Sequence, residues 1–487
     1  MCNSKKAVYG MMKSALLFYR KLVADLVSLG FTINPYDPCV ANKIINDKQL
    51  TVCWHVDDLF LGHEDPAVVS HFLGWLATRY DTDDKKLNVV RGPKHDYLGM
   101  NLDFSTPGTV KIDMTPYINK IVAAFPEKIT GVQSTPAADH LFQIRPASEA
   151  RLLPEEQARA YHHTTAQLLF LSRIQRDIQT TIAFLTTRVK QTDEDEWGKL
   201  KRVLKYLHST QRLPLSLFTD SLTNIVWYVD ASHQTHDDCK GHTGAILTFG
   251  RGATTSSSSN NKILSKSSTE SEIIRFYDKV GDILWTRQFL EAQGYIIKTN
   301  IVYQDNMSTL SLAKNGYVSS SKRTKHIKAK YFFIRHFHHS GELELRYCPT
   351  ESMWADVLSK PLQGAKFRLM RAFLMNCPTD YSEETPSLPI AIPSAYPRLT
   401  PTPLLVKPSR VPSDIPTDNP NPISMKHRSL CPNASSRGCV ETMSHGTHVP
   451  RKRCTKSEPT DRTVSWRDSL FPSNLTATHP ASTPRSP

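Results

Sequence analysis

Apolar residues recur along the chain with two different periods, and each period predicts a different kind of element. Between residues 14 and 29 they follow a helical spacing. Between residues 50 and 56 they alternate with polar residues, which is typical of a strand with one buried face. The stretches HDYLGMNLDF and GTVKIDM predict a further hairpin. From about 150 to 212 the pattern is helical throughout, with basic residues on the polar side.

After residue 224 the pattern changes to short apolar strands separated by helices. The expected strands are NIVWYVDAS, GAILTFG, KILSKS, NIVYQDN and ELELRYC. The expected helices are a long one from Thr269, a second through Leu312, a basic third over HIKAKYFFIRHFHH and a closing fourth over ESMWADVLSK. This alternation predicts an α/β domain with a mixed five-stranded sheet.

Composition separates a last segment from the rest of the chain. Of the 32 prolines, 19 fall between residues 378 and 487, together with many Ser and Thr and few apolar runs. Such a segment cannot bury enough apolar surface to offset the entropy of ordering, so we expect it to be disordered. The whole chain of 487 residues is long enough for two to four domains of roughly 100–200 residues each.

Charge and cysteine content narrow the class of protein. The formal net charge of +14 favours an anionic partner, and nucleic acid is favoured over a membrane. The sequence has no apolar run of 18 residues and no signal-peptide pattern, so we expect neither a membrane protein nor a secreted one. The nine cysteines form no CxxC pair, which predicts reduced thiols.

Two adjacent aspartates, Asp57 and Asp58, interrupt the apolar stretch CWHVDDLFLG. The simplest layout is a hairpin with the pair at or beside its tip. One interpretation is a plain turn, because Asp tolerates turn geometry and bonds its own backbone. The other is a metal site, because a divalent cation relieves the repulsion between carboxylates held together in a folded protein. The pair alone leaves both open.

Four further carboxylates fall at the ends of elements expected after residue 224. They are Asp230, Glu272, Asp305 and Asp356. Gathered at one edge of a sheet, they would suit two magnesium ions ~3.5–4 Å apart that act on a phosphodiester. Each also has a plainer interpretation: a capping box of Thr269 with Glu272, a helix cap for Asp305, a turn for Asp230 and a solvated helix position for Asp356. Their joint placement favours the metal site.

Several motifs together resemble the C-terminal part of the polyprotein of copia-type retrotransposons, a reverse transcriptase followed by a ribonuclease H. VYGMMKSALLFYRKL, WHVDDL and DYLGM resemble reverse transcriptase segments, WHVDDL in place of the YVDD motif. SRIQRDI and LKRVLKYLHST resemble the connection region. VDAS, SSTESEI, YQDN, RTKHIKAKYFFIRHF and ADVLSKPL resemble ribonuclease H motifs. The match covers about residues 5 to 370, in the order of the family.

This resemblance implies a combined α/β and α+β fold in four parts. They are a partial polymerase palm over residues 1–145, a helical thumb or connection region over 146–215, a ribonuclease H-like domain over 216–370 and the disordered tail over 371–487. It also implies that the ribonuclease H part hydrolyses RNA in RNA–DNA hybrids. Expected partners are such hybrids, other nucleic acid and upstream polyprotein segments, in a cytoplasmic particle or the nucleus.

The resemblance also assigns roles to the carboxylates. Catalytic and metal-binding roles, with Mg²⁺ or Mn²⁺, fall on Asp57 and Asp58 in the polymerase. In the nuclease they fall on Asp230, Glu272, Asp305 and Asp356. Integrase-like folds share the sheet, but their acids run Asp, Asp, Glu, and the order Asp, Glu, Asp, Asp favours ribonuclease H.

The sequence departs from the family pattern in ways that bear on activity. The first palm aspartate and the fingers region of the family lie upstream of the segment with which this chain opens, so we expect polymerase activity to be lost. His55 replaces the motif tyrosine, and the stretch YCPTESMW lacks a histidine that some related nucleases have. The alternative to an active ribonuclease H is a catalytically inactive relic that only binds nucleic acid.

Overall fold

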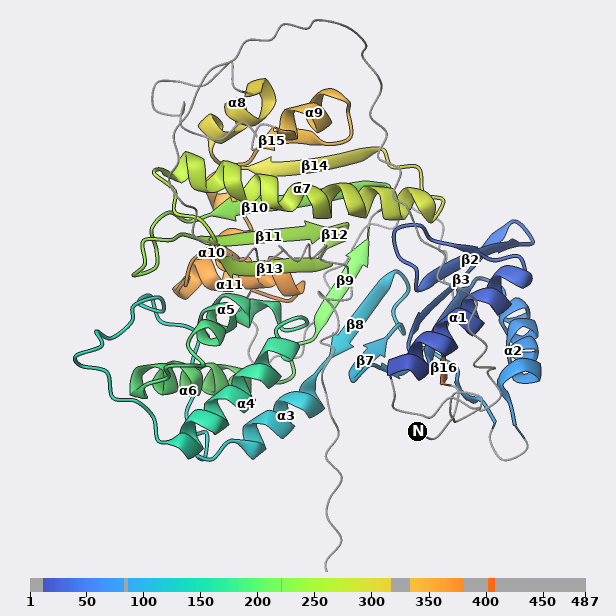
Figure 1. The fold of residues 1–487 in the computed structure, drawn as a ribbon, viewed down its shortest axis with the longest axis horizontal. Coiled ribbons are helices and arrows are strands. Elements are labelled where there is room, and N and C mark those ends of the chain that lie inside the picture. Colours follow the sequence, from blue (N-terminus) through green and yellow to red (C-terminus); the bar gives the residue numbers. More distant parts are fainter. Residues whose placement is uncertain (1–11, 83–85, 220, 317–332, 380–401, 408–487) are drawn as a thin grey trace, which may run out of the picture.

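Three β-sheets and the helices packed on them make up the described part of the chain (Figure 1). The computed structural model describes residues 12–82, 86–219, 221–316, 333–379 and 402–407. The predicted mixture of helices and sheets is confirmed. Among these residues, no helix is both long and apolar enough to cross a membrane. The five described cysteines are free thiols, as predicted.

The first sheet follows the N-terminal helix α1, Met12–Ser28, and has the strand order β1-β2-β3-β4-β16-β5. Its strands are Thr32–Ile33, Val40–Ile45, Lys48–His55, Asp58–His63, Thr402–Lys407 and Asn88–Val90 in that order. Helix α2, Pro66–Tyr80, packs on the same face as α1. Phe18, Leu22 and Leu26 of α1 are fully buried there, which explains the helical apolar spacing of this segment.

The second sheet has the order β12-β9-β8-β7-β6 and leads into a helical region. Its strands are Gly250–Arg251, Leu215–Thr219, Thr109–Asp113, Met100–Asp103 and Lys94–Tyr97 in that order. The helices are α3 Thr115–Ala124, α4 Glu155–Leu171, a 3₁₀ turn Arg176–Ile178, α5 Gln179–Thr187 and α6 Glu194–Ser209. The helical pattern expected from about 150 to 212 is confirmed.

The third sheet contains the strands expected after residue 224, in the order β13-β11-β10-β14-β15. They are Thr255–Asn260, His242–Thr248, Asn224–Ala231, Thr299–Gln304 and Glu344–Tyr347 in that order. Strands β13, β11 and β10 pair antiparallel, whereas β10, β14 and β15 pair parallel, so the predicted mixed five-stranded sheet is present. The 25-residue helix α7, Ser268–Ala292, packs along it (Figure 1).

The remaining helices surround the third sheet. They are α8 Met307–Asn315, α9 Ile334–His339, a 3₁₀ turn Thr350–Ser352, α10 Asp356–Ser359 and α11 Gly364–Met375. The expected closing helix over ESMWADVLSK is therefore a 3₁₀ turn followed by four helical residues. Most of the expected basic helix HIKAKYFFIRHFHH lies outside the described residues, and α9 covers its end.

The third strand of this sheet was predicted in the wrong place. KILSKS lies outside the strands, and the strand is the serine-rich stretch of β13 before it. Serine has no pronounced strand preference, so the apolar pattern pointed past it. The serine hydroxyls serve as bonding groups instead: Ser256 donates to Gln179 Oε1 at 2.8 Å and Ser258 donates to the Leu358 carbonyl at 2.7 Å.

The boundary predicted for the disordered tail is also corrected. Helix α11 continues through residue 371, because Leu374 and Met375 are fully buried in the core that it shares with α3–α6. Further along, β16 pairs with β4 and β5 in the first sheet. The other tail residues from 380 onward lie outside the described part.

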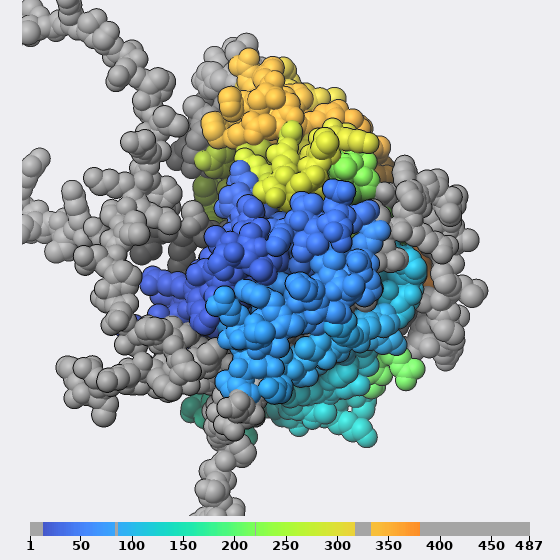
Figure 2. Space-filling view, turned by 90° about the vertical axis from the view of Figure 1, so that its right-hand side faces the viewer, coloured from blue at the N-terminus to red at the C-terminus, as the bar shows by residue number. Residues whose placement is uncertain are grey.

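The N-terminal sheet lies against the C-terminal half of α7, as the meeting of blue and yellow surfaces in Figure 2 shows. The Asn34 side chain donates to the Phe289 carbonyl at 3.3 Å, and Trp285 Nε1 donates to the Tyr36 carbonyl at 3.0 Å. Gln49 Nε2 also donates to Gln293 Oε1 at 3.4 Å, so polar groups of both parts bond across this contact. The end of the third sheet that carries the predicted acids lies at the opposite end of α7, where Glu272 is located.

Candidate nuclease and polymerase sites

The four carboxylates predicted near the third sheet, hereafter the four-acid site, come from four different elements. Asp230 is the penultimate residue of β10, Asp305 directly follows β14, Glu272 lies in α7 and Asp356 begins α10. Because β10 and β14 are parallel neighbours, their carboxyl ends meet at one edge of the sheet. The topology therefore places Asp230 and Asp305 at the same edge.

The carboxylates are close enough to act on one another electrostatically. Burial raises the pKa of Asp230 to about 6, with Asp356 and Asp305 adding to the rise and Lys360 and Ser359 opposing it. Such mutual effects require the charged groups to share one poorly solvated region. Each of the four acids is thus within electrostatic range of at least one other. No three of them have oxygens that all lie within 4.8 Å of one another, and the one such group of three among the described residues lies elsewhere and is treated below.

Asp356 is wholly buried, which rules out the solvated helix position considered for it. Lys360 Nζ lies 2.6 Å from Asp356 Oδ1 and 3.6 Å from Asp230 Oδ2, and Lys366 Nζ lies 2.7 Å from Asp356 Oδ2. The hydroxyl of Ser359 donates to Asp230. Two lysines and a serine thus compensate part of the buried negative charge at this end of the site.

Glu272 is 7% exposed and incompletely paired. Asn306 Nδ2 donates to its Oε1 at 3.1 Å, whereas its Oε2 is buried without a hydrogen-bond partner. Burial raises the pKa of Glu272 to about 9, and Asp230 adds to that rise. A buried carboxyl oxygen that accepts no hydrogen bond is costly, and the described residues offer none to Glu272 Oε2.

Two of the plainer interpretations for these acids are wrong because the helix caps lie at other residues. The cap of α7 is Ser267, which accepts from the Glu270 backbone N–H at 3.2 Å, so Thr269 and Glu272 form no capping box. The cap of α8 is Asn306, which accepts from Thr309 N–H, and Asp305 instead accepts from Thr350 Oγ1 at 3.0 Å. Neither Glu272 nor Asp305 therefore serves as an N-terminal helix cap.

Gly244 is a residue of this site that sequence reasoning missed. It stands directly opposite Asp230 in the pairing of β10 with β11. A Cβ at this position would lie 2.5 Å from the Ala355 carbonyl oxygen and 2.8 Å from Leu358 Cβ. The absence of a side chain therefore lets α10 bring Asp356 down onto the sheet beside Asp230. GAILTFG marked Gly244 only as a strand residue, because the close approach comes from a helix more than 100 positions away.

Lys360 and Ser359 were also missed, although both belong to ADVLSKPL. Both residues contact Asp230 on β10, and Ser359 lies 129 residues after it in the chain. A lysine one turn after Asp356 reads in the sequence as an ordinary helix-surface pair. Only the fold shows that the same ammonium also reaches Asp230.

The other acidic pair lies in a hairpin, hereafter the DD hairpin, formed by β3, β4 and the two-residue turn Val56–Asp57. His55 pairs with Asp58 across it, so the predicted hairpin with the aspartates at its tip is confirmed. Val56 has φ of 55°, a region that β-branched residues rarely adopt. Its side chain is 47% exposed. The turn is thus held in a strained conformation beside the two carboxylates.

A second motif packs beside the DD hairpin. The stretch DYLGM forms the β6–β7 hairpin, whose turn has Leu98 and Gly99 at φ of 54° and 78°. Tyr97 is half-buried there, and loss of solvation raises its pKa well above the usual value, with Cys53 and Asp58 contributing. The fold therefore brings WHVDDL and DYLGM, which are about 40 residues apart, into one electrostatic neighbourhood.

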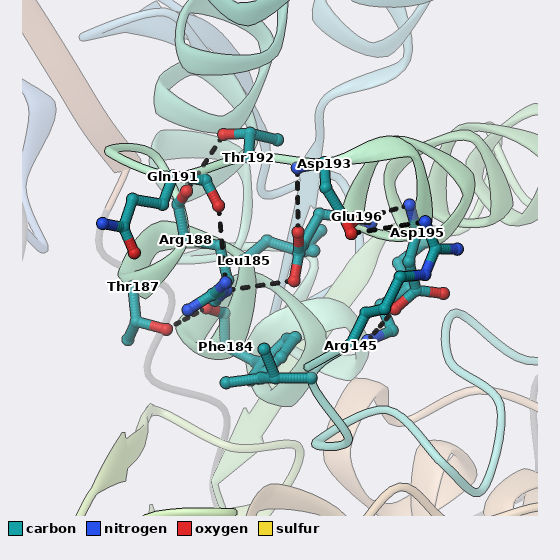
Figure 3. A network of polar contacts seen from close by, with 12 residues as sticks. Arg145, Phe184, Leu185, Thr187, Arg188, Gln191, Thr192, Asp193, Asp195 and Glu196 are labelled. Atoms are coloured by element: carbon teal, nitrogen blue, oxygen red, sulfur yellow. Dashed lines mark hydrogen bonds and ion pairs between the residues drawn. The ribbon is translucent and has the colours of Figure 1, made fainter. Parts of the chain in front are cut away.

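A third acidic group lies at the start of α6 and is fully engaged in the structure (Figure 3). Asp193 caps α6 by accepting from the Asp195 and Glu196 backbone N–H groups, and Glu196 accepts from the Asp193 N–H in return. Arg188 lies 3.0 Å from Glu196, and Arg145 lies 3.4 Å from Asp193. The three carboxylates of this group, Asp193, Asp195 and Glu196, are therefore close together because they lie at a capping box with two arginine partners.

Comparison with known proteins shows that the chain is similar to reverse transcriptases and retrotransposon polyproteins. Residues 1–137 match the family model described as reverse transcriptase (RNA-dependent DNA polymerase). The chain is 26% identical to the retrovirus-related Pol polyprotein from transposon TNT 1-94 of Nicotiana tabacum over 76% of this chain and 28% of that protein. It is 24% identical to the polyprotein from transposon RE2 of Arabidopsis thaliana over 75% of this chain and 24% of that protein. The predicted resemblance to copia-type retrotransposon Pol polyproteins is confirmed.

The extent of these matches limits what they say about each site. The chain spans about a quarter of the length of the Pol polyproteins just named. It also covers 87% of the putative transposon Ty5-1 protein of Saccharomyces cerevisiae, at 24% identity. The reverse transcriptase match contains the DD hairpin and DYLGM and ends before the third sheet. No solved structure matches the chain.

Proposed function

We propose that this chain is a segment of a retrotransposon Pol polyprotein whose third sheet is a ribonuclease H-like nuclease that hydrolyses the RNA strand of RNA–DNA hybrids. The observation that supports the proposal is the four-acid site, in which buried Asp230, Glu272 and Asp356 and partly exposed Asp305 come from β10, α7, α10 and the end of β14 and act on one another electrostatically. We expect the protein to work with nucleic acid and other polyprotein segments in a cytoplasmic particle or the nucleus.

The sheet and the order of its acids support this nuclease class. Three antiparallel strands followed by two parallel ones, with a long helix after the third, agree with the mixed five-stranded sheet with helices expected for such a domain. Along the chain the acids run Asp, Glu, Asp, Asp, which differs from the Asp, Asp, Glu order of integrase-like folds. Their location at a carboxyl edge of parallel strands is also where active sites of open α/β sheets lie.

The residues of the four-acid site fit magnesium or manganese. Four carboxylates supply the oxygen donors that such hard cations prefer, and Glu272 Oε2 is a buried oxygen without a partner. When bound, paired divalent ions activate water and stabilise the leaving oxygen of a phosphodiester. Asp230, Glu272, Asp305 and Asp356 would hold them. Lys360 contacts two of these acids, so its positive charge already offsets part of the negative charge that the cations would compensate.

We also propose that Asp57 and Asp58 are the metal-binding carboxylates of the reverse transcriptase part. Support comes from their position at a hairpin tip within the matched region and from the neighbouring DYLGM hairpin. The side chains of both residues are partly exposed, so they are accessible to a primer end and a nucleotide. Their role would be to position phosphates and neutralise charge, which supplies most of the catalysis in phosphoryl transfer.

The nuclease proposal is tested with the purified chain and an RNA–DNA hybrid labelled on the RNA strand. We expect cleavage that requires Mg²⁺ or Mn²⁺ and is abolished in Asp305→Asn, because the amide keeps the shape but loses the charge. Asp282→Asn is the matched control, since Asp282 lies on the surface of α7 and its one ion pair within the described part of the chain is with Lys279. Cleavage by Asp305→Asn, or cleavage in EDTA, would contradict the mechanism. A chain that binds the hybrid without cutting it would support the inactive relic instead.

A further inference from the structure

A cleft of about 550 Å³ lies between α6 and the segment from residue 133 to 145, outside both acidic sites. Five basic and two acidic residues line it. The basic ones are Arg145, Lys199, Lys201, Arg202 and Lys205, and the acidic ones are Glu194 and Asp195. Its walls therefore carry more positive than negative charge, which favours an anionic ligand.

Partners within the protein account for three of the five cations. Arg145 lies 3.4 Å from Asp193, Lys199 lies 2.7 Å from Asp195, and Lys201 lies 3.0 Å from Glu127. These ion pairs hold the side chains of the cleft walls in place, and their carboxylates offset the positive charge of the three cations. The positive charge that remains belongs to Arg202 and Lys205.

Arg202 is a half-buried guanidinium without a carboxylate bound to it among the described residues. Its Nη2 donates to Thr135 Oγ1 at 2.9 Å, and its Nε is buried without a partner. Burial lowers its pKa, which Asp139 only partly offsets. Lys205, one turn further along α6, forms no ion pair with any residue that the structure describes. Both cations therefore line the cleft with unused capacity for an anion.

The cleft adjoins the four-acid site. A smaller neighbouring pocket is lined by Lys360 and shares Pro136, Ala137 and Thr181 with the cleft. A chain of hydrogen bonds also connects them: Arg202 donates to Thr135, and Thr135 donates to Gln363 Oε1 at 2.9 Å. Gln363 follows Lys360 by three residues, so the free cations of α6 are held in a fixed relation to the proposed nuclease centre.

We propose that this cleft binds the phosphate backbone of the RNA–DNA hybrid beside the point of cleavage, with Arg202 and Lys205 contacting phosphates. The inference rests on the proposed nuclease function for the identity of the nucleic acid. A guanidinium and an ammonium one helical turn apart match successive anionic groups of a backbone, and such contacts position a duplex without reading its sequence. Binding by the cleft would therefore be independent of sequence and strongly dependent on salt.

The test is binding of a fluorescent hybrid of about 20 base pairs, measured by anisotropy in EDTA so that no cleavage occurs. At 0.1 M salt, each lost phosphate contact is expected to weaken binding about eightfold, since each contributes a slope of about 0.9 in log affinity against log salt. Lys205→Gln and Arg202→Gln should each show this loss and a shallower salt slope. Lys298→Gln is the matched control, because this exposed lysine precedes β14 at the end away from Asp305.

The outcomes separate this inference from the nuclease proposal. Thermal unfolding of Lys205→Gln must match the parent chain, which is expected because Lys205 holds no other group in place. If both cleft variants bind as tightly as Lys298→Gln while the parent chain cleaves hybrid in Mg²⁺, the cleft is overturned and the nuclease stands. If the variants show the loss but the parent chain cuts nothing, the cleft stands and the nuclease is overturned. A parent chain that binds no hybrid overturns the cleft.

Discussion

The DD hairpin and the four-acid site present carboxylates in opposite surroundings. Asp57 in the two-residue turn and Asp58 at the start of β4 are partly exposed, and both belong to one hairpin of two adjacent strands that this turn joins. Asp230, Glu272 and Asp356 are buried among elements far apart in the chain, with lysines and a serine arranged around them. The first arrangement is built locally by a hairpin, and the second exists only when the whole third sheet and α10 have assembled.

This difference bears on what each arrangement can do alone. The partly exposed carboxylates of the hairpin keep contact with water, so they avoid much of the desolvation cost of burial. Buried carboxylates that repel one another need compensation, which Lys360 and Lys366 provide only in part. The four-acid site is therefore the region whose stability and chemistry should respond to the removal of charge. The predictions below test this contrast, beginning with the largest effect.

The largest expected effect is on hydrolysis of the hybrid. Asp230→Asn should lower the rate of cleavage by more than about 100-fold, because even the loss of a residue that merely supports a metal ligand costs roughly 10–100-fold. Asp57→Asn should leave this rate within about twofold, since the DD hairpin belongs to a different sheet. Single-turnover cleavage assays measure both. A comparable loss in Asp57→Asn would show that the two acidic regions work as one site.

The second effect concerns the approach of α10 to the sheet. Gly244→Ala should destabilise the protein by about 1–3 kcal/mol, because the added methyl group meets backbone and side-chain atoms at 2.5 and 2.8 Å. Hydrolysis should fall as well, since Asp356 would move away from Asp230. Gly281→Ala is the control: its methyl group meets nothing within 4 Å, so the substitution should be neutral or stabilising. Urea unfolding of both variants gives the comparison, and equal stability would contradict the packing argument.

The third effect is a pH dependence of stability in metal-free protein. The folded pKa of Glu272, about 9, lies above its ordinary value of 4.5, so folding favours the protonated carboxyl. This contribution is fully present below pH 4.5 and is lost as the pH rises toward 9. Glu272→Gln should therefore be more stable than the parent chain by on the order of 1 kcal/mol at pH 8, with the gap closing toward pH 5. Thermal unfolding in EDTA across this range measures it, and parallel pH profiles would refute it.

The smallest effect belongs to the DD hairpin. Val56→Gly should stabilise the protein by about 0.5 kcal/mol, because the relief of a positive φ outweighs the entropy cost of glycine. Little packing is lost, since Val56 is 47% exposed. Hydrolysis of the hybrid should not change. Chemical unfolding of the variant decides the sign, and a destabilised variant would mean that the Val56 side chain contributes more than its exposure indicates.

The elements with strong periodicity were predictable from the sequence, and those without it were not. The alternation around Trp54 placed the DD hairpin correctly, and NIVWYVDAS and NIVYQDN became the parallel strands that carry Asp230 and Asp305. The serine-rich β13 has no apolar alternation, so KILSKS attracted the prediction instead. The cap of α7 was missed because Ser267, Ser268 and Thr269 are all plausible caps, and only the contact with Glu270 decides among them.

The candidate site shows the same division. The location of Asp230 and Asp305 at strand ends could be predicted because the strands that carry them have clear apolar patterns. The partners of the acids could not, because Lys360 and Ser359 act on Asp230 across 129 residues or more, and Gly244 matters through a helix that contacts it from the other end of the domain. Information of this kind exists in the packing and not in any local pattern.

The core that joins the helical region to the end of the third sheet has a consequence for how such elements change over time. Val357 and Leu358 of α10 lie in one apolar cluster with residues of α4, α5 and α6, and Thr180 donates to the Val357 carbonyl at 2.7 Å. Genetic exchange between divergent copies of a retroelement, with a breakpoint near residue 220, would combine a helical region and a third sheet that had not changed together. Such recombinants should fail by mismatched packing, so inheritance across this point should favour closely related parents.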